Sequence, residues 1–331
     1  MASAQQYRPE PLGLTSARNA VARYWASSRG EPAPSVADVL LTASTSEAYA
    51  FLFKLLCDAG DEVLVPAPSY PLFEHLAELE LVKAVPYRLA YDGAWYIDHD
   101  ALKRSVSSRT RAVIVVCPNN PTGHYAASAE LERVAELGLP ILSDEVFFEY
   151  PLCSVQPPRV PQHVLAFRMG GLSKLAGLPQ LKLAWTVLSG PATERQEARE
   201  RLELIADTFL SVGSPVQLAL PALLESTPSV TSAIGARCRQ NLEALRDLTR
   251  SSPLTLLRAE GGWSAVVQVP HVVSEDDLVV SLLEREGVLV QPGWFYDFER
   301  PGYLVLSLLA EPGHFREAAA RLVEHVTRWS A

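Results

Sequence analysis

Short apolar runs alternate with stretches of helical periodicity from about residue 38 to about residue 190. The runs are rich in β-branched residues and end in Gly, Pro, Asn or Asp, which is typical of strands buried on both faces. This alternation predicts a mostly parallel α/β sheet with helices on both sides, a three-layer domain. The predicted strands are 38–43, 61–68, 81–89, 111–116, 139–146 and 164–167, and the helices between them are 46–60, 71–81 and 130–138.

The pattern changes after Gly190, where long helices are predicted at 191–210 and from about Ser229 to Arg250. The last eighty residues mix short predicted strands with two helices, which indicates a smaller α+β unit. We therefore expect a large domain of residues 36–228 and a small domain of residues 1–35 plus 229–331. The strands of the small unit are predicted at 254–261, 263–270, 287–293 and 303–309, and its helices at 274–287 and 313–329.

Composition and charge narrow the classes of function. The chain has 331 residues, of which 48% are hydrophobic and 20% charged, so it can bury a substantial core. Its net charge of -9 argues against a general nucleic-acid binder. No apolar run reaches the roughly 18 residues of a membrane span, and the first residues do not resemble a secretory signal, so a cytoplasmic location is expected. The four cysteines are far apart and form no CxxC pair, and no metal site is predicted.

Polar residues follow the predicted strands at the ends where ligands bind in open α/β sheets. Ser44, Thr45 and Ser46 lie between a strand and a helix, where hydroxyls and free backbone N–H groups can hold an anion. Simple capping of the helix is the more common explanation for such residues, so alone they are a weak signal.

Three further strand ends carry groups of different chemistry. Tyr70 follows the second strand and can stack on a planar ring or simply pack. Asn120 lies in the turn CPNNPTG, where a fixed amide can donate to a ligand oxygen or only shape the turn. Asp144 ends an apolar strand, and a buried carboxylate is costly without a cationic partner, which makes it the most informative of the three.

Lys174 follows the next strand in the glycine-flanked stretch GGLSKLAGLP. A lysine there is either an ordinary loop lysine or one that forms a Schiff base. Together with the anion site, the aromatic ring, the amide and the acid, it matches the needs of pyridoxal 5′-phosphate (PLP). The acid would keep the ring nitrogen protonated, and the lysine would hold the aldehyde.

Over nearly its whole length the chain resembles the fold-type I, class I/II aminotransferases. The resemblance rests on NPTG, SDEV, LSK…GLP…K and VLVQPG in this order and spacing. It implies that Lys174 forms the internal aldimine, that Asp144 pairs with the pyridine nitrogen, that Asn120 contacts the ring oxygen, and that Tyr70 stacks on the ring.

The same resemblance implies further contacts to the cofactor and a homodimer. Ser173 precedes the lysine within the motif. The opening YRPEPLG looks like the segment that supplies a phosphate-contacting tyrosine, here Tyr7, to the neighbouring subunit. The residues expected to hold the phosphate are Ser44, Thr45, Ser46 and Lys182.

Several positions depart from the family pattern. The usual serine three residues before the lysine is Gly171, and the usual arginine eight residues after it is Lys182. Phe147 stands beside the cofactor where the family commonly has a tyrosine, and a phenyl ring donates no hydrogen bond. Val305 occupies the place of the arginine that grips the substrate carboxylate. Arginines that could replace it are Arg8, Arg18, Arg88, Arg168 and Arg300.

The expected function is a PLP-dependent aminotransferase that moves an amino group between an amino acid or related amine and a keto acid. A second hypothesis keeps PLP but changes the reaction to a β-elimination, a racemisation or other carbanion chemistry, because the arginine and tyrosine functions are missing. A third is a catalytically silent binding module, which the joint presence of Lys174, Asp144 and Asn120 disfavours. The substrate itself is left open.

Overall fold

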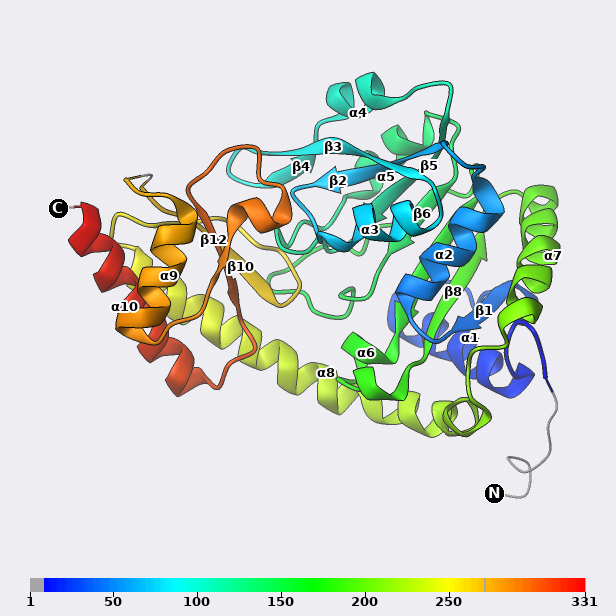
Figure 1. Ribbon diagram of the computed structural model, residues 1–331. Coiled ribbons are helices and arrows are strands. Elements are labelled where there is room, and N and C mark those ends of the chain that lie inside the picture. Colours follow the sequence, from blue (N-terminus) through cyan, green and yellow to red (C-terminus); the bar gives the residue numbers. More distant parts are fainter. Residues whose placement is uncertain (1–8, 271, 331) are drawn as a thin grey trace.

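An eight-stranded sheet forms the centre of the protein in the computed structural model, which describes residues 9–270 and 272–330 (Figure 1). The strand order is β1-β8-β7-β6-β5-β2-β3-β4. Neighbours from β3 through β7 are parallel, whereas β8 is antiparallel to both of its neighbours and β4 is antiparallel to β3. The bounds are β1 (Val39–Thr42), β2 (Glu62–Ala67), β3 (Lys83–Tyr91), β4 (Trp95–Ile97), β5 (Thr110–Val116), β6 (Ile141–Asp144), β7 (Ala166–Gly171) and β8 (Ala184–Ser189).

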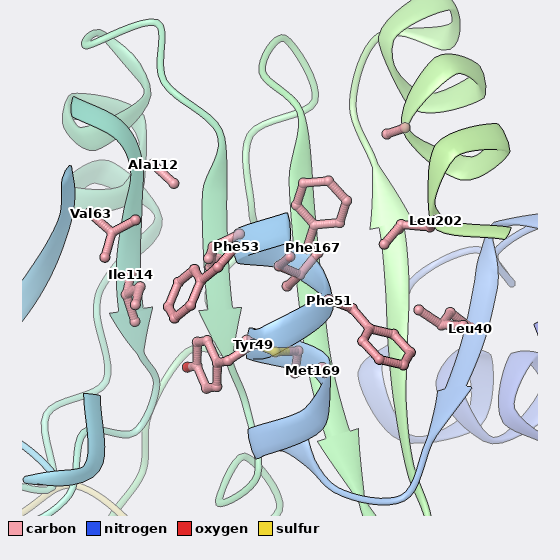
Figure 2. Packing of buried hydrophobic residues seen from close by; sticks show 14 of the residues in the cluster. Leu40, Tyr49, Phe51, Phe53, Val63, Ala112, Ile114, Phe167, Met169 and Leu202 are labelled. Atoms are coloured by element: carbon pink, nitrogen blue, oxygen red, sulfur yellow. The ribbon is translucent and has the colours of Figure 1, made fainter. Parts of the chain in front are cut away.

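Helices cover both faces of this sheet, which confirms the predicted three-layer α/β class. On one face the aromatic side of α2, with Tyr49, Phe51 and Phe53, packs onto Ile114 and Phe167 of the strands (Figure 2). The six predicted strands are present as β1, β2, β3, β5, β6 and β7, and their apolar runs reflect burial on both faces, whereas β4 and β8 were not predicted. The helices up to α7 are α1 (Thr15–Arg29), α2 (Thr45–Leu56), α3 (Leu72–Leu79), α4 (His99–Ser105), α5 (Ser128–Ala135), α6 (Leu172–Leu175) and α7 (Ala192–Phe209).

A second, four-stranded antiparallel sheet has the order β11-β12-β10-β9. Its apolar residues pack against α8, α9 and α10, while Val266 and Val305 join the core cluster of the large sheet. The small unit is therefore tied to the large one through a shared core. Its elements are α8 (Ser214–Thr249), β9 (Thr255–Leu256), β10 (Ser264–Gln268), α9 (Glu275–Glu286), β11 (Gln291–Pro292), β12 (Tyr303–Ser307) and α10 (Pro312–Ser330).

Helix α8 begins at Ser214, so the prediction of a start near Ser229 was wrong. Pro221 and Pro228 lie inside the helix. Proline removes a helical hydrogen bond and usually ends a helix, but burial of Leu220 and Leu224 against the rest of the protein compensates here.

The predicted domain limits at 36 and 228 stay predictions. Helix α1, which they assign to the small domain, packs with β1, β8 and α8 in one apolar cluster, and α8 runs across residue 228 (Figure 1). Among the described residues, no helix is long and apolar enough to cross a membrane. The described ranges also contain no group of three or more side chains suited to a metal ion.

Candidate functional site

The polar strand ends meet at one edge of the large sheet. In the parallel part, Val116 of β5 is aligned with Asp144 of β6, which is aligned with Met169 of β7. The segments carrying Asn120, Asp144 and Lys174 therefore leave three adjacent strands at the same level. Tyr70 follows β2, the next strand along. The structure thus brings these four residues, predicted from separate motifs, to one edge.

Lys174 lies on the short helix α6 that directly follows β7. Its Nζ is 5.8 Å from the ring centroid of Phe147 and 5.6 Å from that of Trp263. The Tyr150 hydroxyl donates to the backbone carbonyl of Lys174 at 2.7 Å. Within the described ranges no carboxylate forms an ion pair with its amine. The amine is thus half-buried beside two aromatic rings and has no fixed counter-charge.

Asp144 is the most unusual of the polar residues at the strand ends of the large sheet. Its carboxylate is buried without a paired cation among the described residues. The Tyr49 hydroxyl donates to its Oδ2 at 3.1 Å, and the backbone N–H of Val146 donates to its Oδ1 at 3.3 Å. Burial raises the pKa of Asp144 to about 6, although these two donors and the Lys174 amine oppose the rise. A buried acid of this kind is suited to pair with a cation that a ligand brings.

The Asn120 side chain is oriented by the small sheet. The hydroxyl of Ser264, the first residue of β10, donates to Asn120 Oδ1 at 3.2 Å. Among the described residues, none accepts a hydrogen bond from the Asn120 amide nitrogen. That N–H₂ group is therefore free to donate to a ligand.

The N-terminus of α2 lies at the same edge. Ser44 caps the helix, since its Oγ accepts from the Glu47 N–H at 3.1 Å. The capping hypothesis for Ser44 is therefore confirmed, while Thr45 and Ser46 are half-buried in the first turn with no side-chain hydrogen bond to another described residue. Lys182 is exposed and has a left-handed backbone with φ of 51°. Hydroxyls, free N–H groups and an unpaired amine are what a phosphate needs.

The remaining predicted positions are less distinctive. Tyr70 is 46% exposed. The Phe147 ring is buried and packs edge-on against Trp263, with centroids 5.2 Å apart. Ser173 is half-buried. At Gly171 a Cβ would lie 3.0 Å from the Cβ of Ala184, so a serine there would require a small shift of β8. Tyr7 lies outside the described residues.

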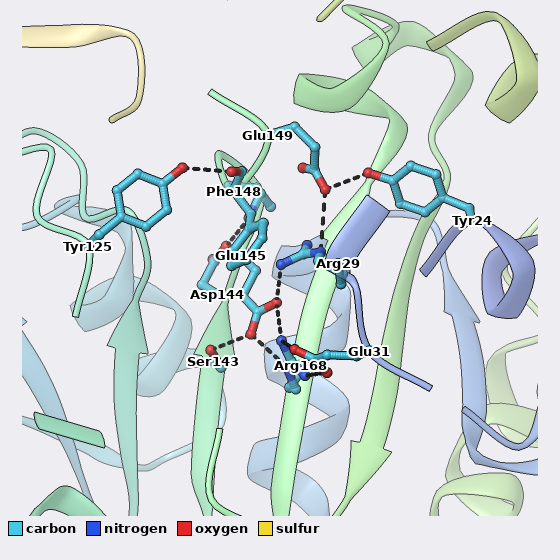
Figure 3. Close-up of polar contacts among 11 residues, drawn as sticks. Tyr24, Arg29, Glu31, Tyr125, Ser143, Asp144, Glu145, Phe148, Glu149 and Arg168 are labelled. Atoms are coloured by element: carbon cyan, nitrogen blue, oxygen red, sulfur yellow. Dashed lines mark hydrogen bonds and ion pairs between the residues drawn. The ribbon is translucent and has the colours of Figure 1, made fainter. Parts of the chain in front are cut away.

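A buried ion-pair network lies directly behind Asp144 (Figure 3). The guanidinium of Arg168 contacts Glu145 at 2.8 Å and Glu31 at 2.6 Å, and Arg29 contacts Glu145 at 2.7 Å. Burial opposes ionisation of Glu145, but the two arginines hold its pKa below the usual value. The network ties the end of α1 and the following segment to the strand that carries Asp144.

Comparison with known proteins identifies the family of this chain. Residues 4–322 match the family described as aminotransferase class I and II. The chain belongs to this family. It is 27% identical to the glutamate-pyruvate aminotransferase AlaA of Haemophilus influenzae, over 98% of this chain and 83% of the relative. An alanine aminotransferase of Mycobacterium tuberculosis is 28% identical over 94% of this chain and 76% of the relative. The chain is similar in structure to the alanine aminotransferase of Pyrococcus furiosus, with a TM-score of 0.88, 25% identity, and coverage of 99% and 85% of the two chains.

The protein is thus an aminotransferase, and PLP is its cofactor. The residues present fit that group. Among the residues that the structure describes, the buried Asp144 carboxylate has no paired cation and the Asn120 amide nitrogen has no acceptor, while the α2 N-terminus offers hydroxyls and N–H groups. Each of these features suits a different part of PLP: the ring nitrogen, the ring oxygen and the phosphate.

The family pattern predicts that Val305 stands in place of the arginine that grips the substrate carboxylate. Val305 lies in the middle of β12, 3% exposed, and is paired with Val266 of β10. Val266 lies two residues from Ser264 and so faces the same side of β10. Since residues directly opposite in an antiparallel pair share a face, Val305 faces the side from which Ser264 reaches Asn120. Val266 and Val305 thus present apolar side chains on that face of the small sheet.

The proposed replacement arginines have different surroundings. Arg18 donates to the carbonyls of Gly13 and Val36, and Arg168 is occupied by the network behind Asp144, so neither is free for a substrate. Arg8 lies outside the described residues. The last two, Arg88 and Arg300, line a cavity beside Tyr70.

Three residues of the site were not predicted: Tyr49, Trp263 and Ser264. Tyr49 belongs to the apolar face of α2 by its spacing, so its polar contact with Asp144 had no signal in the sequence. Trp263 and Ser264 follow Gly261 and Gly262, a turn signal that could have pointed to a backbone placed close to the site. Nothing in the sequence pairs that turn with Asn120.

Proposed function

We propose that Lys174 is the residue through which this aminotransferase holds PLP and transfers the substrate proton. The observation that carries the proposal is the buried, cation-free Asp144 one strand away from an unpaired half-buried lysine. When bound, PLP supplies an electron-withdrawing ring that stabilises negative charge on the reacting carbon of the substrate.

The other residues of the site hold the cofactor in this proposal. Asp144 accepts from the protonated ring nitrogen, and Tyr49 and the Val146 N–H keep its carboxylate in place. The free amide end of Asn120 donates to the ring oxygen, with its orientation fixed by Ser264. Tyr70 covers one face of the ring, and Ser173 and Phe147 stand beside it. The phosphate contacts are assigned to Ser44, Thr45, Ser46 and Lys182.

The Lys174 amine has two tasks. Its Nζ would hold the cofactor when no substrate is bound, and as a general base and acid it would take up the proton from the amino-bearing carbon of the substrate and later give it back. The rings of Phe147 and Trp263 limit the approach of water to this amine, since both lie within 6 Å of it. The Tyr150 hydroxyl fixes the backbone from which the lysine extends.

We further propose a cytoplasmic homodimer in which Tyr7 contacts the phosphate of the neighbouring subunit. The amino group passes from an amino acid or related amine to a keto acid. The relatives named for glutamate, pyruvate and alanine support this class of substrate without fixing it, because Val305 removes the usual carboxylate contact.

A half-reaction tests the proposal. Holoenzyme mixed with excess amine should lose the visible band of its bound cofactor and yield pyridoxamine phosphate with one equivalent of carbonyl product. Lys174→Ala should abolish this conversion, whereas Lys103→Ala, at an exposed lysine of α4, should retain it. Release of ammonia with PLP retained would instead indicate an elimination, and full activity of Lys174→Ala would refute the assigned role.

A further inference from the structure

The cavity beside Tyr70 suggests where the substrate carboxylate binds. Its volume is about 650 Å³, and it opens between β2, α3 and β3 on one side and residues 297–303 of the small unit on the other. Tyr70 lines it and also follows the strand next to that of Asn120. Among the described residues that line the cavity, Tyr70 is the one that also belongs to the predicted cofactor contacts.

Two guanidinium groups and an apolar wall line this cavity. The wall includes Trp95, Phe298 and Tyr303, and the last two rings stack with centroids 4.6 Å apart. Arg88 reaches it from β3, and Arg300 from the loop before β12. An alkyl chain suits the aromatic wall, and a carboxylate suits two arginines.

Acidic groups of the cavity do not neutralise both arginines. Arg88 lies 3.3 Å from Glu299, but both side chains are at least half exposed. Such pairs contribute little, so a ligand anion can displace Glu299. Arg300 has no ion pair with any described residue. The two remaining acids of the cavity are Asp297 and Glu74. Burial raises the pKa of Asp297, and the nearby charge of Glu74 raises it further.

The register of the large sheet sets the distance between Arg88 and Asp144. Arg88 is aligned with Ala67 at the end of β2, and Asp144 with Val116 at the end of the neighbouring β5. Three strand spacings thus separate the Cα atoms of Arg88 and Asp144, roughly 14 Å. The family pattern predicts a carboxylate one bond from the reacting carbon beside Val305, which offers no charge. Only a carboxylate several bonds away extends toward Arg88.

We propose that the amino donor carries its carboxylate at the far end of an alkyl chain, and that Arg88 and Arg300 bind this carboxylate in the cavity beside Tyr70. This inference rests on the function proposed above. The amino group passes to the cofactor, the amino-bearing carbon becomes an aldehyde, and water supplies the aldehyde oxygen. The chain of the donor lies along the aromatic wall.

Three amines test the inference on the holoenzyme: 5-aminopentanoate, pentylamine and L-alanine. We expect the highest kcat/KM for 5-aminopentanoate. In the double variant Arg88→Gln/Arg300→Gln, its advantage over pentylamine should fall about tenfold to a hundredfold, the value of lost hydrogen bonds to a charged group. Arg316→Gln, at an exposed arginine of α10, is the matched control and should keep the wild-type ratio.

Calorimetric titration with pentanoate gives a readout without turnover. Pentanoate should bind the wild type and Arg316→Gln and lose affinity in the double variant. A preference for L-alanine, or equal pentanoate binding by all three proteins, overturns the inference while the aminotransferase function stands. If none of the amines yields pyridoxamine phosphate, the proposed function fails first, and the inference falls with it.

Discussion

The substitution Asp144→Asn should make the cofactor-free protein more stable at neutral pH. Burial raises the pKa of Asp144 from 3.8 to about 6 in the folded state. An acid with a raised pKa in the folded state stabilises the fold below its unfolded pKa, and this contribution is lost as the pH rises through the folded value. The shift of about 2 pKa units corresponds to roughly 3 kcal/mol.

The assay is urea denaturation of cofactor-free wild type and Asp144→Asn between about pH 4 and pH 8. The variant should gain up to about 3 kcal/mol over the wild type as the pH rises, most of it between pH 4 and 6, because it has no carboxylate to ionise. Its affinity for PLP should fall, since an amide cannot pair with a protonated ring nitrogen. Asp207→Asn, at an exposed acid of α7, is the control.

If the difference in unfolding free energy between wild type and Asp144→Asn did not change with pH, the reasoning would be refuted. That result would mean that burial does not raise the pKa of the Asp144 carboxyl. A variant less stable than the wild type at neutral pH would contradict it as well. Unchanged PLP affinity would separate Asp144 from the ring nitrogen even if the stability result held.

Three other substitutions test neighbouring contacts. Tyr49→Phe removes a donor from Asp144 Oδ2, so the pH below which PLP affinity drops should rise by about one unit; an unshifted pH profile would show that the bond does not matter. Ser264→Ala frees the Asn120 amide and should weaken PLP binding about fivefold in a fluorescence titration, the value of one hydrogen bond of about 1 kcal/mol; equal affinity would contradict this. Arg168→Met breaks buried ion pairs and should lower the free energy of unfolding by about 3 kcal/mol in urea, and a loss under 1 kcal/mol would argue against the network.

Six of the eight strands of the large sheet and the main strand-end residues could be predicted from the sequence for local reasons, whereas β4 and β8 were missed. Continuous apolar runs marked the buried strands, and a carboxylate at the end of such a run marked Asp144 because its burial is costly. Order and spacing of the motifs then led to Lys174 and Asn120. The apolar runs and the terminal acid are local signals, whereas the motif order extends from Asn120 to Gly293.

The supporting contacts could not be predicted because their partners are distant in sequence. Tyr49 lies 95 residues from Asp144, and Ser264 lies 144 residues from Asn120. Tyr49 occupies a helix face that its periodicity assigns to the core, and its hydroxyl acquires a role only when the sheet forms. Helix α8 was mispredicted for the same reason, since tertiary packing keeps Pro228 within the helix.

Chemical trapping of the cofactor tests the central claim most directly. Borohydride reduction of the holoenzyme followed by peptide mapping should place one phosphopyridoxyl group on Lys174, and Lys174→Ala should carry no label. A label on Lys182 or on any other lysine, or a purified protein that takes up no PLP at all, would contradict the account.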